Sequence, residues 1–212
     1  MRNVYSFGKD SALALHKLAA SGHTPVCLVT ATNIDNDRSW THGIAKPLAD
    51  AASQSLGLPL IRAVCKSADY EAAFESALRE AAALRAEACA FGDMDVDLHL
   101  EWNRARCAAA GLECLTPLWG MSREAAVAET LALGFEPVIK LVRKESLGAE
   151  FLGKTLTPQV VDAIRAAGAD VCGENGEYHT FVVAGPGYGT RAAVIRGEIL
   201  DLGDYLTIDL TA

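Results

Sequence analysis

Short apolar runs alternate with longer, alanine-rich amphipathic stretches along the first half of this 212-residue chain. The apolar runs predict strands at residues 3–7, 25–32, 60–65, 88–91 and 114–115. The amphipathic stretches predict helices at residues 11–21, 44–56, 70–84 and 96–110. Strands that alternate with helices at this spacing favour βαβ units and a parallel sheet. Because the strands are apolar almost throughout, we expect both faces of the sheet to be covered.

The pattern changes after residue 118. One more helix is predicted at residues 122–133, a strand at 137–142, and a helix opened by Thr157 and Pro158. Strands follow at residues 178–184, 192–199 and 205–210. We therefore predict a Rossmann-like α/β domain with a parallel sheet over residues 1–118 and a smaller α+β domain over residues 119–212. We expect the second domain to pack against the open edge of the first.

Composition narrows the classes of partner. The formal net charge is −8 and no basic run is present, so we expect no nucleic acid as a general partner. No apolar stretch approaches 20 residues and no secretory signal is apparent, so we expect no membrane partner and a cytoplasmic protein. Six cysteines without a Cys-x-x-Cys pair are typical of buried thiols in a reducing compartment.

A polar turn follows the first predicted strand. Residues 6–11 read Ser-Phe-Gly-Lys-Asp-Ser, directly before a helix. The free N–H groups and the positive end of a helix bind anions. Lys9 adds a positive charge, and Ser6 and Ser11 add hydroxyl donors. The segment therefore predicts a phosphate site, with an ordinary strand–helix turn as the alternative.

Two other residues of this turn have their own interpretation. Gly8 permits close approach of the backbone to a ligand or a positive φ. Asp10 either caps the helix or helps to hold Mg²⁺. The turn is not a Walker A loop, because that pattern requires glycine where this chain has Asn3.

A second group of polar residues lies near the end of the chain. Residues 173–182 read Gly-Glu-Asn-Gly-Glu-Tyr-His-Thr-Phe-Val, a turn followed by a strand. On an extended chain Glu177 and His179 share one face, and Tyr178 and Thr180 share the other. Glu177 and His179 are candidates for an acid/base or substrate-orienting pair. The alternative is the solvated face of an exposed strand.

Both segments resemble those of known families. Residues 6–11 are similar to the Ser-Gly-Gly-x-Asp-Ser loop of the ATP pyrophosphatases, except that Phe7 stands where glycine is usual. That side chain either crowds a pyrophosphate or points into the core. Residues 173–180 resemble the Gly-Glu-x-Gly-Glu-[Tyr/Phe]-x-Thr signature of the diphthine–ammonia ligase family. Residues 38–42, 111–120 and 150–154 resemble three further elements of that family, in the same order along the chain.

The resemblance implies an enzyme that binds ATP in its first domain, cleaves it to AMP and pyrophosphate, and adenylates a carboxylate that ammonia then attacks. The implied partners are ATP with Mg²⁺, ammonium, and an unidentified carboxylate substrate that is free or carried by a protein; whether the chain forms a homo-oligomer stays open. The implied nucleotide-binding residues are Ser6, Gly8, Lys9, Asp10 (also for Mg²⁺), Ser11, Thr30, Thr32, His42, Gly92 and Asp93. The implied catalytic residues are Glu174, Asn175, Glu177, His179 and Thr180.

Two other functions are weighed against this one. The first is a module that binds or hydrolyses adenine nucleotides without ligase activity, an interpretation that Phe7 favours and residues 173–180 disfavour. The second is a tRNA-modifying enzyme with the same loop. That class is expected to have paired catalytic cysteines and a basic face, and the sequence indicates neither.

Overall fold

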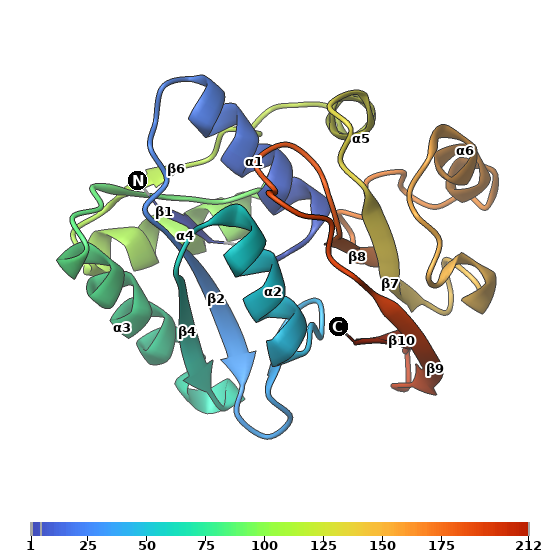
Figure 1. Ribbon diagram of the computed structural model, residues 1–212, viewed down its shortest axis with the longest axis horizontal. Coiled ribbons are helices and arrows are strands. Elements are labelled where there is room, and N and C mark those ends of the chain that lie inside the picture. The colour runs from blue at the N-terminus through green and yellow to red at the C-terminus, as the bar shows by residue number, and fades with distance from the viewer. Residues whose placement is uncertain (1, 5, 212) are drawn as a thin grey trace.

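The computed structural model describes residues 2–4 and 6–211 and contains two separate sheets (Figure 1). In the first sheet the strands lie in the order β4-β2-β1-β5-β6, with the short β3 beside the end of β2. These pairs are parallel except for β2 with β3. The strands are β1 (Arg2–Val4), β2 (Cys27–Asn33), β3 (Arg38–Ser39), β4 (Leu60–Cys65), β5 (Ala88–Ala90) and β6 (Glu113–Leu115).

The second sheet is antiparallel and lies in the order β8-β7-β10-β9. Its strands are β7 (Pro137–Arg143), β8 (Tyr178–Val182), β9 (Ile195–Asp201) and β10 (Tyr205–Thr211). A parallel sheet followed by an antiparallel sheet with helices confirms the predicted fold class. The proposed boundary at residue 118 lies between the last strand of the first sheet and the first strand of the second.

Six helices cover the sheets in the described chain, and their ends follow local chemistry. They are α1 (Lys9–Ala20), α2 (Lys46–Leu56), α3 (Tyr70–Ala83), α4 (Asp97–Ala109), α5 (Arg123–Ala132) and α6 (Pro158–Ala166). Ser122 and Thr157 cap α5 and α6 by accepting backbone N–H bonds. Gly57 ends α2 in the left-handed conformation. These caps explain why the helix predictions are right to within a few residues.

The predicted strand over residues 3–7 is wrong at its end. β1 ends at Val4, Tyr5 lies outside the described residues, and residues 7–8 form a bend. Phe7 has a left-handed φ of 66°, which no strand residue adopts. Helix α1 consequently begins at Lys9, two residues before the prediction, so that Lys9, Asp10 and Ser11 occupy its first turn.

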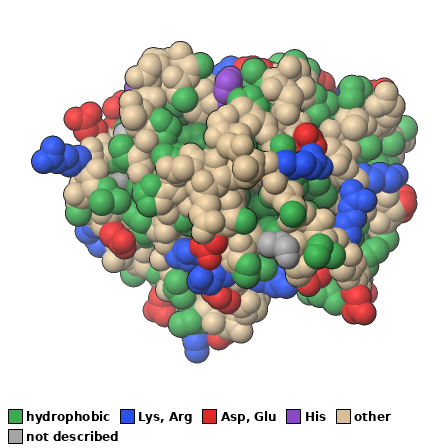
Figure 2. Space-filling view, in the orientation of Figure 1, with side chains coloured by type: hydrophobic (Ala, Val, Ile, Leu, Met, Phe, Trp, Pro, Cys, Tyr) green, Lys and Arg blue, Asp and Glu red, His purple; other side chains and the backbone are tan. Residues whose placement is uncertain are grey.

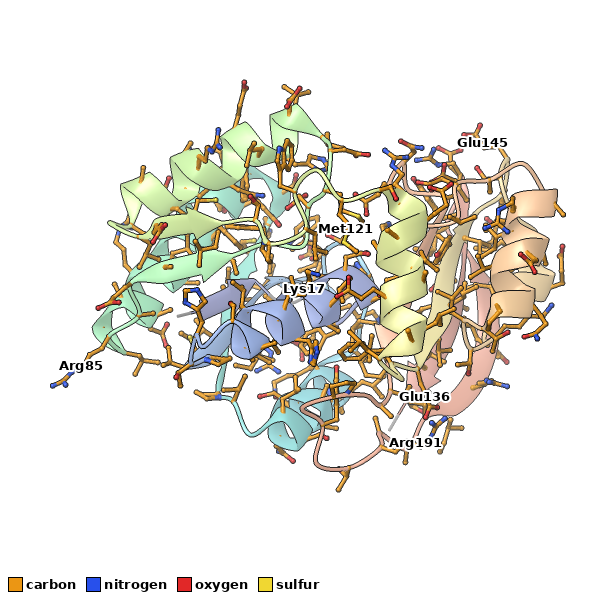
Figure 3. All side chains as sticks on the ribbon, turned by 90° about the horizontal axis from the view of Figure 1, so that it is seen from above. Lys17, Arg85, Met121, Glu136, Glu145 and Arg191 are labelled. Carbon is orange, nitrogen blue, oxygen red and sulfur yellow. The ribbon has the colours of Figure 1, made fainter. Side chains whose placement is uncertain are left out.

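The second sheet packs mainly against helices of the first part. Strand β8 and helix α5 contact α1, and β10 contacts α2. The second part also meets the first sheet beside β3, where Arg38 pairs with Asp209 of β10 at 2.8 Å, so the expected contact with an edge is made but is secondary to the helix contacts. One hydrophobic cluster runs from Leu13 and Leu48 on these helices to Ile139 and Phe181 in the second sheet. Figure 3 shows α1 beside α5, where Lys17 pairs with Glu129 at 2.8 Å.

The other face of the first sheet has its own core. Helices α3 and α4 cover it, and Phe74, Leu78 and Cys107 pack there against Val29 and Cys89 of the strands. Both faces of the parallel sheet are thus buried, as its apolar strands predicted.

Basic and acidic side chains are interspersed on the face of the molecule shown in Figure 2, and they form no large patch of one charge there. Among the described residues, every helix is too short or too polar to cross a membrane.

Candidate active site

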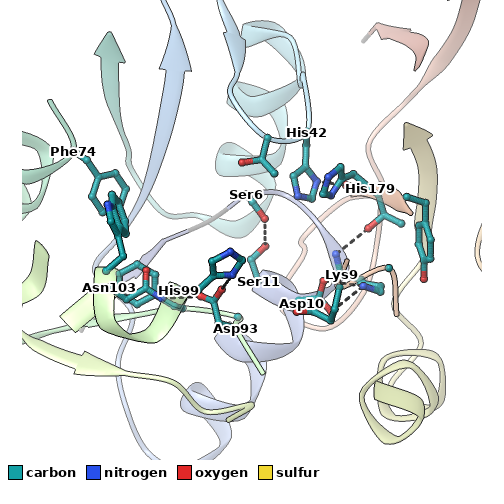
Figure 4. Close-up of a pocket in the computed structure, with 18 of the residues that line it drawn as sticks. Ser6, Lys9, Asp10, Ser11, His42, Phe74, Asp93, His99, Asn103 and His179 are labelled. Carbon is teal, nitrogen blue, oxygen red and sulfur yellow. Dashed lines mark hydrogen bonds and ion pairs between the residues drawn. The ribbon is translucent and has the colours of Figure 1, made fainter. Parts of the chain in front are cut away.

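A cavity of about 350 Å³ lies where β1 and β5 end and α1 begins. This is the edge of a parallel sheet at which ligands bind in α/β folds. Its opposite wall comes from residues 41–42, residues 173–174 and the start of β8. Figure 4 shows side chains of the two sequence segments facing one another across it. Ten of the proposed site residues line it: Ser6, Lys9, Asp10, Ser11, His42, Gly92, Asp93, Glu174, His179 and Thr180.

The two segments are joined by hydrogen bonds. The backbone N–H of Lys9 donates to Oγ1 of Thr180 at 3.0 Å, so the second segment caps the first turn of α1. Beside this contact, the Ser6 hydroxyl donates to the Ser11 hydroxyl at 3.3 Å, and that of Ser11 donates to the carbonyl of Gly8 at 2.9 Å. The hydroxyl groups of both serines therefore lie at the positive end of α1.

Lys9 and Asp10 form a buried ion pair in the lining of the cavity. The Lys9 side chain is 4% exposed, and its ammonium lies 2.8 Å from a carboxylate oxygen of Asp10. Burial, the largest single cause, lowers the pKa of Lys9, but Asp10 together with Cys172, Tyr178 and Glu174 holds that pKa well above its ordinary value. Lys9 is therefore a permanent cation at neutral pH.

A second carboxylate has no such cation of its own. Burial, and then repulsion from Asp10, raise the pKa of Glu174 above its ordinary value. The ligand atoms of Asp10, Glu174 and Cys172 all lie within 4.8 Å of one another. The Cys172 thiol donates to Asp10 at 3.6 Å, and burial raises its pKa, so it remains protonated. Two carboxylates without a thiolate are a donor set that suits Mg²⁺.

Two imidazole rings form the wall opposite the loop. The rings of His42 and His179 are 4.7 Å apart between centroids. Nδ1 of His42 lies 2.7 Å from the carbonyl oxygen of Thr180. Because a carbonyl only accepts, His42 carries its proton on Nδ1, which leaves a lone pair on Nε2. Burial lowers the pKa of His42 to about 4 and that of His179 well below its ordinary value, so both rings are neutral at pH 7.

These neutral rings predict a loss of stability in acid. The folded-state pKa of His42 is depressed, so its stabilising contribution is complete above pH 6.5 and is lost as pH falls through about 4. The difference between 6.5 and about 4 corresponds to about 3 kcal/mol. We expect the free energy of unfolding to depend less on pH in this window for His42→Gln than for the wild type, by about that amount. Urea unfolding at pH 7 and pH 4 measures it.

His23→Gln is the matched control, because His23 is exposed beyond the end of α1. It should keep the wild-type pH dependence. If the free energy of unfolding depended on pH identically in His42→Gln and the wild type, the neutral state of the His42 ring would be contradicted.

Gly8 and Gly92 are required because neighbouring atoms lie too close for a side chain, and not because of their backbone conformation. A Cβ atom on Gly8 would lie 2.3 Å from Cε1 of His42, and one on Gly92 would lie 2.8 Å from the backbone of Asp10. Neither position has a positive φ. Any larger residue would push His42 or the loop after β5 away from α1.

Phe7 occupies the glycine-like position of the turn without reaching the cavity. Its φ is 66°, its side chain is fully buried, and its ring lies 6.5 Å from that of Phe181. Of the two alternatives stated from the sequence, the structure shows that the side chain points into the core. The ring therefore does not crowd the cavity.

An aromatic wall was missed by sequence reasoning. Tyr70 and Phe74 of α3 and Trp102 of α4 line the cavity with ring centroids 5.1–6.2 Å apart. Beside them Asn103 donates to Asp93 at 2.8 Å. The spacing of three and four residues between His99, Trp102 and Asn103 places them on one helix face, which was the available signal. Only the fold shows that this face meets the cavity.

Five of the proposed site residues do not line this cavity: Gly8, Thr30, Thr32, Asn175 and Glu177. Thr30 lines a small neighbouring cavity of about 50 Å³, and Thr32 is buried in β2 opposite Ser39. The amide of Asn175 donates to Glu177 at 3.1 Å, so these two side chains close the turn before β8. Tyr178, His179 and Thr180 all line the cavity, so residues from both predicted faces of β8 contribute to it.

Comparisons with known families cover nearly the whole chain. The family model described as diphthamide synthase N-terminal domain matches residues 1–114. The model described as diphthamide synthase C-terminal domain matches residues 122–208.

Curated relatives share both parts. The chain is 25% identical to the diphthine–ammonia ligase of Rattus norvegicus, covering 92% of this chain and 82% of the relative. It is 23% identical to the diphthine–ammonia ligase of Homo sapiens, covering 93% of this chain and 83% of the relative. It is 22% identical to that of Danio rerio, covering 86% of this chain and 81% of the relative. A solved structure, a predicted subunit of tRNA methyltransferase from Methanocaldococcus jannaschii, is 16% identical with a TM-score of 0.47, covering 87% of this chain and 97% of that one. That structural likeness is too distant to support any inference.

Proposed function

This chain belongs to the diphthamide synthase family, and from that premise we propose that it is an ATP-dependent ligase that converts a carboxylate and ammonia into an amide, with release of AMP and pyrophosphate. The observation that carries the proposal is that one cavity holds both halves of the chemistry. Lys9 and the hydroxyls of Ser6 and Ser11 face it from the first turn of α1 and the turn before it, while Glu174, His179 and Thr180 face it from the second part of the chain. A module that only binds nucleotides has no need of the second half.

The first half of the reaction activates the carboxylate. A carboxylate oxygen attacks the α-phosphorus of ATP, and the bond from that phosphorus to pyrophosphate breaks. The N-terminus of α1, Lys9, Ser6 and Ser11 stabilise the phosphate charge. The aromatic wall of Tyr70, Phe74 and Trp102 supplies a flat apolar surface for the adenine.

The second half forms the amide. The nitrogen of ammonia attacks the acyl carbon, the bond from that carbon to the AMP oxygen breaks with its electron pair left on AMP, and nitrogen releases one proton to solvent. The rings of His42 and His179 are neutral at pH 7, so their unprotonated nitrogen atoms accept hydrogen bonds from ammonia and hold it by the acyl group. All six cysteines are free thiols, which fits a reducing cytoplasmic setting for this reaction.

Magnesium fits this site through Asp10 and Glu174. When bound, the ion neutralises phosphate charge. Without it, the two carboxylates share the single positive charge of Lys9. We expect Asp10→Asn or Glu174→Gln to raise the Mg²⁺ concentration for half-maximal ATP cleavage by about tenfold or more. Because Glu174 must lose its proton, the wild-type requirement should fall as pH rises, and Glu174→Gln should lose this dependence.

The control for the magnesium experiment is Asp50→Asn. Asp50 pairs with Lys46 and Arg62 and does not line the cavity. An unchanged Mg²⁺ requirement in both cavity variants would remove these carboxylates as ligands.

The proposed function is tested with Mg-ATP, ¹⁵N-ammonium and a cell extract depleted of ATP. AMP and pyrophosphate should appear only when extract is present, and ¹⁵N should enter an amide that mass spectrometry detects. ATP binding without AMP under any condition would instead favour a module without ligase activity. ADP and phosphate as products would contradict cleavage between the α and β phosphates.

A further inference from the structure

The cavity of about 350 Å³ described above is called the nucleotide cavity from here on. A second cavity adjoins it and has no role in the steps above. It has a volume of about 280 Å³ and lies between residues 33–43 and the second sheet. Thr41 lines both this cavity and the nucleotide cavity. The small cavity beside His42 also touches both, because Ser39, Trp40 and Thr41 line it together with Ser6. The three spaces therefore follow one another along residues 39–42.

The inner wall of the second cavity carries a buried lysine without a carboxylate partner. Lys140 of β7 is 1% exposed. Its ammonium donates to Oγ1 of Thr207 at 2.9 Å and to the carbonyl of Ile208 at 3.1 Å, both neutral oxygen atoms. No ion pair of Lys140 exists within the described chain, whereas the other deeply buried lysine, Lys9, pairs with Asp10. An unpaired buried cation is costly, and a bound anion would offset that cost.

The surrounding charges leave the cavity positive. Arg38 also lines the cavity, donating to Asp209 at 2.8 Å and to the carbonyl of Gly43 at 3.1 Å. Two cations and one carboxylate line the space, so one positive charge is unbalanced. Burial, and then the charge of Arg38, lower the pKa of Lys140 to about 8, and an anion beside it would reverse that shift.

The rim of the cavity is apolar. Leu200 and Leu202, at the end of β9, line it and remain 43% and 57% exposed. A ligand with an anionic group at Lys140 would therefore meet hydrophobic side chains where it leaves the cavity.

We propose that this cavity is a recognition subsite for the acyl substrate, in which Lys140 and Arg38 bind a carboxylate or phosphate group other than the carboxylate that is activated. Leu200 and Leu202 contact the adjoining apolar part of the same substrate. The assignment of the ligand to the acyl substrate rests on the proposed ligase function, whereas the anion site itself does not. The preferred substrates are thus acids that carry a second anionic group.

The first test measures anion binding with the nucleotide site filled. Protein saturated with α,β-methylene-ATP and Mg²⁺ is titrated calorimetrically with glutarate and with inorganic phosphate. We expect at least one probe to bind the wild type and to bind Lys140→Gln at least ten times more weakly; which one binds distinguishes a carboxylate from a phosphate. Lys144→Gln, an exposed lysine of the same part of the chain, is the matched control and should bind like the wild type. No binding of either probe, or equal binding to wild type and Lys140→Gln, overturns the proposal.

A second test does not depend on a folded Lys140 variant. The Lys140 side chain of the wild type is followed by NMR through a pH titration, with and without the anion. We expect the pKa of Lys140 to rise from about 8 when glutarate or phosphate is bound. An unchanged midpoint would overturn the site.

These tests are separate from those of the ligase reaction. Affinity for the nucleotide analogue should be the same in Lys140→Gln and the wild type, because Lys140 does not line the nucleotide cavity. In the extract assay, Lys140→Gln should lower AMP release at low extract concentration and recover it at high concentration. If the wild type binds the anion and releases AMP, but AMP release by Lys140→Gln does not recover at high extract concentration, the anion site lies outside substrate recognition. If the wild type releases no AMP, only the ligase function is contradicted.

Discussion

Lys9→Met is expected to lower the rate of AMP release by about 10²- to 10³-fold, the largest effect of any substitution considered in this chain. The Lys9 ammonium is buried, permanently charged and set in the first turn of α1. Charge-assisted hydrogen bonds contribute about 1.5–3 kcal/mol each, so the Kd for ATP should also rise about 10- to 100-fold. Methionine keeps the length of the side chain and removes the charge, which leaves the carboxylates of Asp10 and Glu174 without a cation.

Lys17→Met is the matched control for this experiment. Lys17 lies on the same helix, but its ammonium pairs with Glu129 at the surface, outside the cavity. We expect its ATP affinity and its rate of AMP release to equal those of the wild type. Fluorescence titration with an ATP analogue and chromatography of AMP measure the two quantities. A Lys9→Met protein that is folded and retains both would remove the loop from phosphate binding.

Phe7→Gly is expected to lower the free energy of unfolding by about 2–3 kcal/mol and to leave ATP cleavage per folded molecule unchanged. Loss of a buried phenylalanine side chain costs about 3–5 kcal/mol. Relief of the left-handed backbone returns about 1–2 kcal/mol, because glycine adopts a φ of 66° without strain. Turnover should not change, because the ring lies against Phe181 and does not line the cavity that contains Lys9.

Phe7→Ala separates the two contributions. It removes the same ring but keeps a Cβ atom at a positive φ, so it should be less stable than Phe7→Gly by about 1 kcal/mol. Urea unfolding of both variants measures the difference. A rise in ATP cleavage in Phe7→Gly would show that the ring restricts the nucleotide after all, and equal stability of the two variants would contradict the strained backbone.

The sequence by itself determined the features that depend on neighbouring residues. The alternation of strands and helices, the caps at Ser122 and Thr157, and the placement of a polar turn before α1 follow from local pattern and local hydrogen bonding. The family was also readable, because its signatures are contiguous segments in a fixed order. One local element was not predicted: β3 has only two residues, too few to show a periodic pattern.

Tertiary structure decided which side chains meet, because contacts between distant segments leave no trace in local periodicity. Thr180 reaches Lys9 across 171 positions of sequence, whereas Glu177, three residues before it, faces its own turn. Every residue of strand β9 is exposed, and the strand begins and ends later than predicted because its ends are set by pairing with β10. Lys140 stands in an apolar strand pattern that indicates burial but cannot name its neighbours. Only the folded chain places it beside Arg38 at the wall of a second cavity.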